Sequence, residues 1–563
     1  MRVTYWAEHA WLNPDPAPAP TSGAGLGAGA GATAGPGSGT GGGSGVGAGA
    51  STGATAGPGA TPGPGAGAGA SPAAGPPAAD PTSSTSTPTG QPLTGALPTG
   101  VVAGVVIDVH DGVVAAVRTG VASPPPGAVV LRGLTVPGLA NAHSHAFHRA
   151  LRGAAQVSPT AGAAGAAGTA EAAGAGGAAG ATGATGSAGD RAPDSFWTWR
   201  EVMYTAAERL TPDSYHALAR ATYAEMALAG ITCVGEFHYL HHGPGGSRYQ
   251  DPNAMGEALL AAAADAGIRI TLLDTAYLSA GFGQPPTRPQ LRFSDGTADA
   301  WAQRASALKA PAHARIGAAV HSVRAVPADQ LGTVAQWATS RDTPLHVHLS
   351  EQTAENDACR AAHGRTPTQL LAEHGVLGPR TVAVHATHLT EADIAHLGGA
   401  RTGVCMCPTT ERDLADGIGP AVALQRAGSP LSLGSDSHAV IDLFEEARAM
   451  ELDERLRTRA RGHWTAAELL RAATADGHAA LGWEQAGRIA PGALADFTTL
   501  ALDSVRTAGP PPALGVETAV FAASNADVRH TVVGGRHIVR DGAHTLLPDV
   551  PTALAQSIAA VLG

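Results

Sequence analysis

The chain has 563 residues and a formal net charge of −11, from 35 lysines and arginines against 46 aspartates and glutamates. This acidic balance excludes a general nucleic-acid-binding surface, which needs a basic face to meet phosphates. No apolar run reaches the ~18 residues of a membrane span, and the first residues, MRVTYWAEHAWL, lack the basic-then-apolar order of a signal peptide. The four cysteines form no disulfide framework and no paired CxxC motif. We therefore expect a cytoplasmic protein with a small-molecule partner, and no nucleic acid or membrane as partner.

Two alanine- and glycine-rich tracts, residues 17–98 and 154–193, interrupt the chain. They have no apolar periodicity and almost no large side chains, so they cannot bury enough apolar surface to offset the entropy of ordering their backbone. We predict that both are disordered, which leaves about 440 residues to fold. This is enough for a barrel, which commonly takes ~250 residues, and a smaller domain.

Short strand patterns occur towards both ends of the chain. Residues 1–16 and 99–133 include a β-branched run around an Asp-Gly turn, VVIDVHDGVVAAVR. Residues 489–563 contain the similar segments ADFTTLAL and HTVVGGRHIVRDG before a terminal helix. Because the intervening chain alternates strand and helix, we predict a small β-sandwich domain built from both chain ends around a central α/β domain.

Residues 134–488 alternate apolar segments with helix-like stretches. Gly230 is placed to end one such helix, SYHALARATYAEMALAG, before a strand that begins at Ile231. Alternation of this kind over eight segments predicts a parallel (β/α)8 barrel of the TIM type, with an open doubly wound sheet as the alternative fold. The eight segments are LTVPGLANAH, ITCVGEFHY, RITLLDTAY, IGAAVHSV, PLHVHLSE, TVAVHATH, TGVCMCPT and PLSLGSDS.

Polar residues close nearly every one of these segments, and in such barrels the C-terminal strand ends carry the chemistry. His143 and His145 lie two residues apart on the first strand, so both imidazoles point to the same side. His348 ends the fifth segment and Asp436 the eighth. Because zinc takes nitrogen and oxygen ligands, and a catalytic site keeps one position for water, these four residues predict a catalytic zinc site.

The motifs PGLANAHSH, HVHLSE, VHATH, GSDSH and GALADF resemble the amidohydrolase superfamily, in particular its mononuclear deaminase branch. The resemblance covers nearly all of the foldable chain and implies a metal-bearing barrel with a β-sandwich made from both ends. The spacing to Glu351 favours His348 over its neighbour His346 as a ligand. An N/O site of this type also admits iron or manganese. The ligands that the resemblance implies, for one Zn²⁺ per subunit, are His143, His145, His348 and Asp436.

The same resemblance implies that Glu351 and His385 work beside the metal. Zinc lowers the pKa of bound water to about 7, so hydroxide is available at neutral pH. Glu351 is then predicted to take the proton of water and deliver it to the substrate nitrogen. His385 is predicted to polarise the tetrahedral centre, and Asp436 to accept a proton as well as bind zinc. The structural alternatives are a helix N-terminal carboxylate for Glu351 and a buried, backbone-bonded histidine for His385.

Further segments are similar to the formimidoylglutamate deiminase family, namely NAHSHAFHRAL, DSFWTWREVMY, VGEFHYLHH, HSVRAV, VHATHL, CPTTERDLADGI and GSDSH. The substrate of that family carries two carboxylates, so its pocket needs cations and hydroxyl donors. Arg324, three residues after His321, is placed to meet a carboxylate. The resemblance adds Arg200, Tyr239 and His321 as donors, and His148 stands where relatives commonly have glutamine.

Several of these residues have structural alternatives. Arg200 could form an ion pair on a helix surface, and Tyr239 could pack at the barrel rim. His238, His241 and His242 are predicted to be loop or rim side chains rather than a second metal site. The tract at residues 154–193 follows the first strand and so lies on the catalytic face, where we predict that it does no chemistry.

The resemblance implies hydrolysis of N-formimidoyl-L-glutamate to N-formyl-L-glutamate and ammonia in histidine degradation, and it suggests a homodimer. The alternative within enzymes is another zinc aminohydrolase, acting on a purine, pyrimidine or triazine, although Arg200 and Arg324 favour a dicarboxylate. A non-catalytic barrel scaffold is the third hypothesis. The complete set of ligands together with Glu351 and His385 counts against a scaffold.

Overall fold

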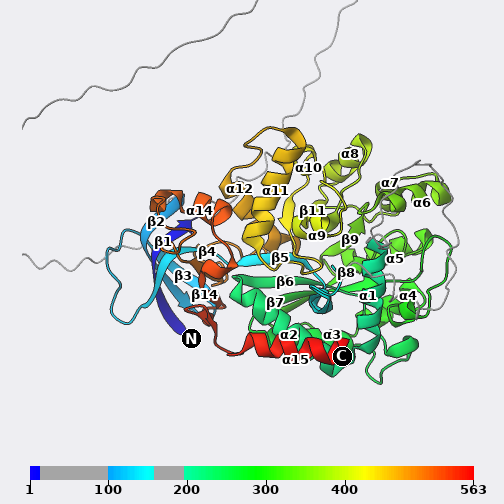
Figure 1. Ribbon diagram of the computed structural model, residues 1–563, viewed down its shortest axis with the longest axis horizontal. Coiled ribbons are helices and arrows are strands. Elements are labelled where there is room, and N and C mark those ends of the chain that lie inside the picture. The colour runs from blue at the N-terminus through cyan, green and yellow to red at the C-terminus, as the bar shows by residue number, and fades with distance from the viewer. Residues whose placement is uncertain (13–98, 157–195) are drawn as a thin grey trace, which may run out of the picture. The chain divides into compact units, whose positions relative to one another are not determined.

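Residues 1–12, 99–156 and 196–563 are described by the computed structural model (Figure 1). The first tract predicted to be disordered, residues 17–98, lies outside the described residues, as do residues 157–193 of the second. No helix of the described part of the chain is long and apolar enough to cross a membrane. The described residues form two eight-stranded sheets, one from the centre of the chain and one from its two ends.

The central sheet has its eight strands in chain order, each parallel to the next. A parallel bridge between Ser144 and Asp436 joins its two edges. Gly434 permits this approach, because a Cβ there would lie 2.7 Å from His143 Cβ. The predicted barrel is confirmed and the doubly wound alternative is wrong. The barrel strands are β5 (Leu139–Ser144), β6 (Ile231–His238), β7 (Arg269–Ala276), β8 (Ala314–Val320), β9 (Leu345–Leu349), β10 (Thr381–His385), β11 (Gly403–Met406) and β12 (Leu431–Leu433).

Helices alternate with these strands, and α2 (Pro212–Leu228) shows why they begin and end where they do. The Thr211 side chain accepts a hydrogen bond from the Ser214 N–H and so caps the first turn. Gly230 follows the helix with a φ of 84°, a left-handed conformation that suits glycine, and β6 begins at the next residue, as predicted. The other helices of the central region are α1 (Phe196–Arg209), α3 (Ala254–Ala266), α4 (Ala298–Ala305), α5 (Ala328–Ser340), α6 (Thr353–His363), α7 (Pro367–Glu373), α8 (Glu391–Gly399), α9 (Pro408–Asp413), α10 (Ala421–Ala427), α11 (Leu443–Thr458), α12 (Ala466–Ala472) and α13 (Ala475–Ala480).

The second sheet is built from both chain ends, as predicted. Its first strand pairs antiparallel with residues 100–110 and parallel with residues 129–137, and residues 497–500 from the C-terminal part pair with the latter strand. Tyr5 and Phe497 meet edge to face in its core, with 5.0 Å between ring centroids. Hydrogen bonds join all its strands in the order β16 (Ala543–His544), β15 (Arg536–Arg540), β14 (Val528–Val533), β13 (Phe497–Leu500), β4 (Val129–Pro137), β1 (Arg2–Leu12), β2 (Gly100–His110) and β3 (Val113–Arg118).

A buried ion pair joins the barrel to the second sheet. Arg269, at the start of β7, donates from Nε and Nη2 to the two carboxylate oxygens of Asp496, at 2.6 and 3.0 Å. Asp496 is fully buried and directly precedes β13. The C-terminal helix α15 (Val550–Leu562), red in Figure 1, packs against α2. Both contacts position the end-built sheet against the central barrel.

The predicted first barrel segment, LTVPGLANAH, is shared between the two sheets. Leu134 to Pro137 end β4 of the second sheet, and the barrel strand β5 begins only at Leu139. The change of sheet occurs at Pro137 and Gly138, where proline has no N–H to donate to a ladder and glycine has no Cβ. A Cβ on Gly138 would lie 2.3 Å from Thr232 Oγ1. The apolar pattern is continuous across this point and does not reveal the change.

Candidate active site

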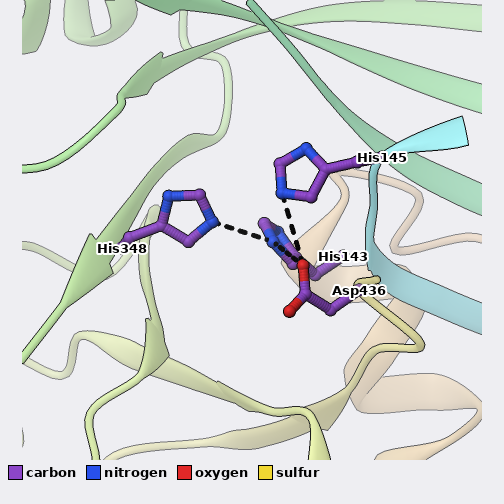
Figure 2. A group of neighbouring side chains, drawn as sticks. All are labelled: His143, His145, His348 and Asp436. Carbon is purple, nitrogen blue, oxygen red and sulfur yellow. Dashed lines mark hydrogen bonds and ion pairs between the residues drawn. The ribbon is translucent and has the colours of Figure 1, made fainter. Parts of the chain in front are cut away.

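Four side chains converge at the carboxyl-terminal ends of the barrel strands (Figure 2). Asp436 Oδ1 lies 3.2 Å from His143 Nε2 and 3.3 Å from His145 Nε2. His348 Nε2 lies 3.1 Å from His143 Nε2. One donor atom from each of the four buried residues lies within 4.8 Å of the others. The structure thus brings together the four residues predicted to bind a metal.

Backbone carbonyls orient two of these imidazoles. His145 Nδ1 lies 3.0 Å from the Phe237 carbonyl oxygen, and His348 Nδ1 lies 2.9 Å from that of His321. Because a carbonyl only accepts, each Nδ1 carries a proton, and each Nε2 faces the cluster. Burial also lowers the pKa of His348 well below its usual value. Neutral imidazoles beside a carboxylate form a donor set that fits a divalent metal.

The alternative ligand, His346, does not take part in this cluster. Its Nε2 lies 3.0 Å from the carbonyl oxygen of Ala480 and therefore donates to it. Side chains alternate along β9, so His346 and His348 share one side of the strand but lie at different depths in the barrel. His346 is thus a buried histidine satisfied by the backbone at the Nε2 atom.

Backbone strain is concentrated at the site. Asp436 has a φ of 42° and His385 a φ of 68°, both in the left-handed region that non-glycine residues rarely adopt. Such conformations cost of order 1–3 kcal/mol each and persist where the surroundings hold them. The backbone at the end of β5 holds Asp436 in this conformation. The Asp436 N–H donates to the His143 carbonyl at 3.0 Å, and the Asp436 carbonyl accepts from the His145 N–H at 3.3 Å. Barrel closure therefore places this carboxylate.

His385 lies among three carboxylates. Its Nε2 is 3.8 Å from Glu351 Oε1 and 3.7 Å from Asp436 Oδ2, and its Nδ1 is 3.4 Å from Glu411 Oε1. Burial opposes the charged imidazolium, but the three carboxylates outweigh burial and raise the pKa of His385 well above its usual value. For Glu351, burial raises the pKa, the His385 charge opposes that rise and Asp436 adds to it. The site therefore contains a buried acid–base pair.

Glu411 is a site residue that the sequence reading did not identify. It lies on α9, and its Oε1 accepts a hydrogen bond from the Cys407 N–H at 2.9 Å while it faces His385 Nδ1. The residue belongs to the segment CPTTERDLADGI, whose resemblance to the family does not single out Glu411. No pattern in the chain connects Glu411 with His385, because only the barrel brings β10 and α9 together.

A pocket lies beside the metal-binding cluster and contains most of the predicted site residues. Every residue predicted to act in catalysis or substrate binding lines it, and His143 is the one predicted ligand that does not. Leu414 is the one lining residue with an aliphatic side chain. The lining residues are His145, His148, Trp199, Arg200, Met203, Tyr204, Tyr239, Tyr277, His321, Arg324, His348, Glu351, His385, Leu414 and Asp436.

Two arginines supply positive charge to this pocket. Arg324 donates from Nε to Glu355 Oε2 at 2.8 Å. Arg200, on α1, donates from Nε to the Tyr204 hydroxyl at 2.6 Å and from Nη2 towards the Tyr277 hydroxyl at 3.5 Å. A guanidinium has five N–H donors, so the single bond from Arg324 Nε leaves its two terminal amino groups for a further acceptor.

His148 and Tyr239 contact one another in the same pocket, with 3.0 Å between Nε2 and the phenol oxygen. Burial lowers the pKa of His148 well below its usual value, so the imidazole is neutral at physiological pH. A neutral histidine at this position is a hydrogen-bonding group without charge, as the glutamine that the resemblance leads us to expect there would be. His148 therefore supplies the polarity expected of the position.

The segment EFHYLHH contributes no second metal site. His241 and His242 lie in the loop after β6 and His238 ends that strand, which agrees with loop or rim positions, and all three are about 1% exposed. His238 and His241 lie near the Asp274 carboxylate, which binds Arg304 through both oxygens at 2.7 and 2.8 Å. The arginine cation already neutralises Asp274 and would repel a metal ion. These histidines are instead part of the buried polar network around that ion pair.

Two tyrosines of the pocket were also missed. Tyr204 lies on α1, and Tyr277 directly follows β7. The second has a signal in the sequence, because RITLLDTAY is one of the barrel segments that ends in a polar residue. Tyr204 has no such signal, since its helix reaches the pocket from outside the strands.

Comparisons with known proteins agree with this architecture. Residues 134–538 match the model of the amidohydrolase family. Formimidoylglutamate deiminase of Pseudomonas aeruginosa is 37% identical over 447 residues, which cover 77% of this chain and 90% of the relative. 8-Oxoguanine deaminase of the same organism is 32% identical over 61% of this chain and 76% of the relative. The crystal structure of an amidohydrolase from Brucella melitensis is 31% identical, with a TM-score of 0.71 over 82% of this chain and 97% of that one. The chain therefore belongs to the amidohydrolase family, as a homologue of formimidoylglutamate deiminase and a metal-dependent hydrolase that acts on carbon–nitrogen bonds.

Proposed function

We propose that the chain hydrolyses N-formimidoyl-L-glutamate to N-formyl-L-glutamate and ammonia, and that its metal is zinc. The observation that supports this most is one pocket lined by His145, His348 and Asp436 together with two arginines, Arg200 and Arg324. The histidines and the aspartate suit a hydrolytic metal, and the arginines suit a substrate with two carboxylates. The relative with 37% identity carries the name of this activity.

The imidazoles of His143, His145 and His348 and the Asp436 carboxylate would hold the zinc ion. When bound there, zinc would supply Lewis acidity that brings the pKa of water towards 7. Backbone hydrogen bonds already orient His145 and His348 towards this cluster. Iron and manganese are the competing metals for such a donor set.

Glu351 is the proposed proton carrier. Water adds to the formimidoyl carbon, one of its protons passes to the Glu351 carboxylate, and the carboxyl returns that proton to the imine nitrogen. The proton of the added hydroxyl then passes through Asp436 to the same nitrogen, which leaves as ammonia. The carbon–nitrogen bond breaks as the formyl carbonyl forms, so one water is consumed for each ammonia released. The His385 imidazolium, 3.8 Å from Glu351, stabilises negative charge as it develops on the attacking oxygen.

The substrate carboxylates are assigned to the cationic part of the pocket. Arg324 offers its terminal amino groups, and Arg200 adds a second guanidinium. His321, His148 and Tyr239 line the same pocket and provide neutral hydrogen-bonding groups. For His321, burial and the nearby Arg324 lower the pKa well below its usual value, so it acts as a neutral imidazole.

Ammonia release tests the proposal. Protein freed of metal by a chelator and then loaded with zinc is assayed with formimidoylglutamate and, separately, with guanine. We expect turnover of formimidoylglutamate that depends on the restored zinc, with no turnover of guanine. Release of ammonia from guanine alone would replace the proposed substrate by a purine. Equal activity after loading with manganese or iron would leave the substrate in place and remove the preference for zinc.

A reducing compartment agrees with the state of the cysteines. All four, Cys233, Cys359, Cys405 and Cys407, are buried and free. We propose on this ground that the enzyme works in the cytoplasm, where thiols stay reduced.

A further inference from the structure

Two pocket phenols, those of Tyr204 and Tyr277, form a hydrogen-bonded group that we name the tyrosine pair. Gln290, on the short helix η3 (Pro289–Arg292), donates from Nε2 to the Tyr277 hydroxyl at 2.8 Å and to the Tyr204 hydroxyl at 3.1 Å. Arg200 donates to the same two oxygens at 3.5 and 2.6 Å, respectively. The proposed reaction assigns no role to the tyrosine pair or to Gln290.

The orientation of the Gln290 amide is determined by its neighbours. Its Oε1 lies 2.8 Å from the Thr287 backbone nitrogen and 2.7 Å from the Thr287 hydroxyl. A backbone N–H can only donate, so the atom that it meets must be the amide oxygen. The amide nitrogen therefore faces the tyrosine pair. Gln290 is about 1% exposed, so no bulk water competes for these bonds.

The tyrosine pair is consequently surrounded by donors. Arg200 has no acceptor atom, and Gln290 presents its NH₂ group, so both phenol oxygens accept and neither can donate to these partners. Each phenol has one hydroxyl proton. Within the described residues the hydrogen bonds offer no acceptor for either proton.

Of the two phenols, that of Tyr277 lies at a strand end. Its oxygen accepts from Gln290 at 2.8 Å, whereas the Arg200 contact is long at 3.5 Å. Tyr277 lies at the C-terminal end of β7 and lines the pocket, with its ring centroid 4.4 Å from that of His321. A buried O–H without an acceptor costs free energy that a ligand oxygen would recover.

We propose that the Tyr277 hydroxyl donates a hydrogen bond to one carboxylate of the substrate, and that Gln290 orients this hydroxyl by donating to its oxygen. The inference rests on the proposed function and names a specificity residue for it. A carboxylate bound beside Arg200 would accept hydrogen bonds from both the Arg200 guanidinium and the Tyr277 hydroxyl. A neutral purine offers no carboxylate oxygen to receive this proton, so the tyrosine pair selects for an acidic substrate.

The test is Tyr277→Phe, which removes one oxygen and keeps the ring. Steady-state ammonia release is measured with N-formimidoyl-L-glutamate and with two analogues that each lack one carboxylate, the N-formimidoyl derivatives of 4-aminobutyrate and of 2-aminopentanoate. Tyr5→Phe is the matched control, because its hydroxyl bonds the Gly535 carbonyl at 3.1 Å in the second sheet, away from the pocket. Zinc content and thermal unfolding are recorded for every variant.

We expect Tyr277→Phe to lower kcat/KM for formimidoylglutamate about tenfold or more, mainly through KM, since bonds from a neutral donor to a charged acceptor are among the strong ones. The loss should disappear with the one analogue that lacks the contacted carboxylate. Tyr204→Phe should give a smaller loss on the same substrates, and Tyr5→Phe none. An unchanged kcat/KM for Tyr277→Phe, or an equal loss on all three substrates, would overturn the inference while the proposed function stands. Absence of turnover of formimidoylglutamate by the unaltered chain would overturn the proposed function, and the inference with it.

Discussion

Replacement of Glu351 by glutamine keeps the shape of the side chain and removes its capacity to carry a proton. Glu351 is about 7% exposed, so bulk water has little access to replace it as a proton carrier. General acid–base catalysis contributes 10²–10⁴-fold, and we therefore expect kcat to fall at least ~100-fold, or about 2.7 kcal/mol of transition-state stabilisation. The assay is steady-state ammonia release, with zinc content measured in parallel. Near-normal turnover with zinc retained would refute the assignment of proton transfer to Glu351.

The pH dependence of the same variant sharpens the test. Burial raises the pKa of Glu351, with the His385 charge opposing the rise. The carboxylate must be unprotonated to accept a proton from water, so activity should be lost as the pH falls through this raised pKa. We expect an acid limb of kcat/KM above the usual glutamate pKa of ~4.3, and no such limb for Glu351→Gln. Glu351→Asp is the matched control, because it keeps the titrating group but withdraws it by about one carbon–carbon bond, ~1.5 Å. It should retain the limb at reduced kcat.

Three further predictions concern binding, stability and the alanine- and glycine-rich tract. Arg324→Met should raise KM for formimidoylglutamate more than it lowers kcat, because a hydrogen bond to a charged group contributes ~1.5–3 kcal/mol; an unchanged kcat/KM would remove Arg324 from substrate binding. Arg269→Met leaves the buried Asp496 carboxylate without its bidentate partner and should cost ~3–5 kcal/mol of unfolding free energy in a denaturant titration. Arg380→Met, which breaks an exposed ion pair, should cost at most ~1 kcal/mol, and equal losses would contradict the role given to burial. Deletion of residues 156–188 should change neither kcat/KM nor zinc content, whereas lost turnover with full zinc content would show that the tract takes part in catalysis.

The metal-binding residues could be predicted because their signal is local. His143 and His145 share a side of one strand by simple alternation, and His348 and Asp436 each end an apolar segment at the same edge of a parallel barrel. The structure brings these four together without requiring any contact that the sequence hides. The choice of His348 over His346 likewise followed from motif spacing, and the bond from His346 to Ala480 agrees with it.

Residues that act through distant contacts could not be predicted in this way. Glu411 meets His385 across 26 residues of chain, and Gln290 meets Tyr204 across 86. Neither lies at a strand end, and neither has a periodic pattern that would mark it. The placement of His238 and His241 near the charges of the later residues Asp274 and Arg304 could not be predicted either. Long-range pairing of polar groups leaves no trace in a single sequence.

The residues at strand ends and the residues that act through distant contacts also have different roles in the site. The proposed metal ligands and Glu351 belong to the barrel strands or the residues directly after them, where backbone pairing sets their geometry. Arg324 and Tyr277 of the substrate pocket also follow barrel strands, whereas Arg200 and Tyr204 on α1 line it from outside the strands. Gln290 on η3 bonds Tyr204 and Tyr277 without lining the pocket itself. We therefore expect substitutions in α1 and η3 to alter substrate choice while the hydrolytic centre stays intact.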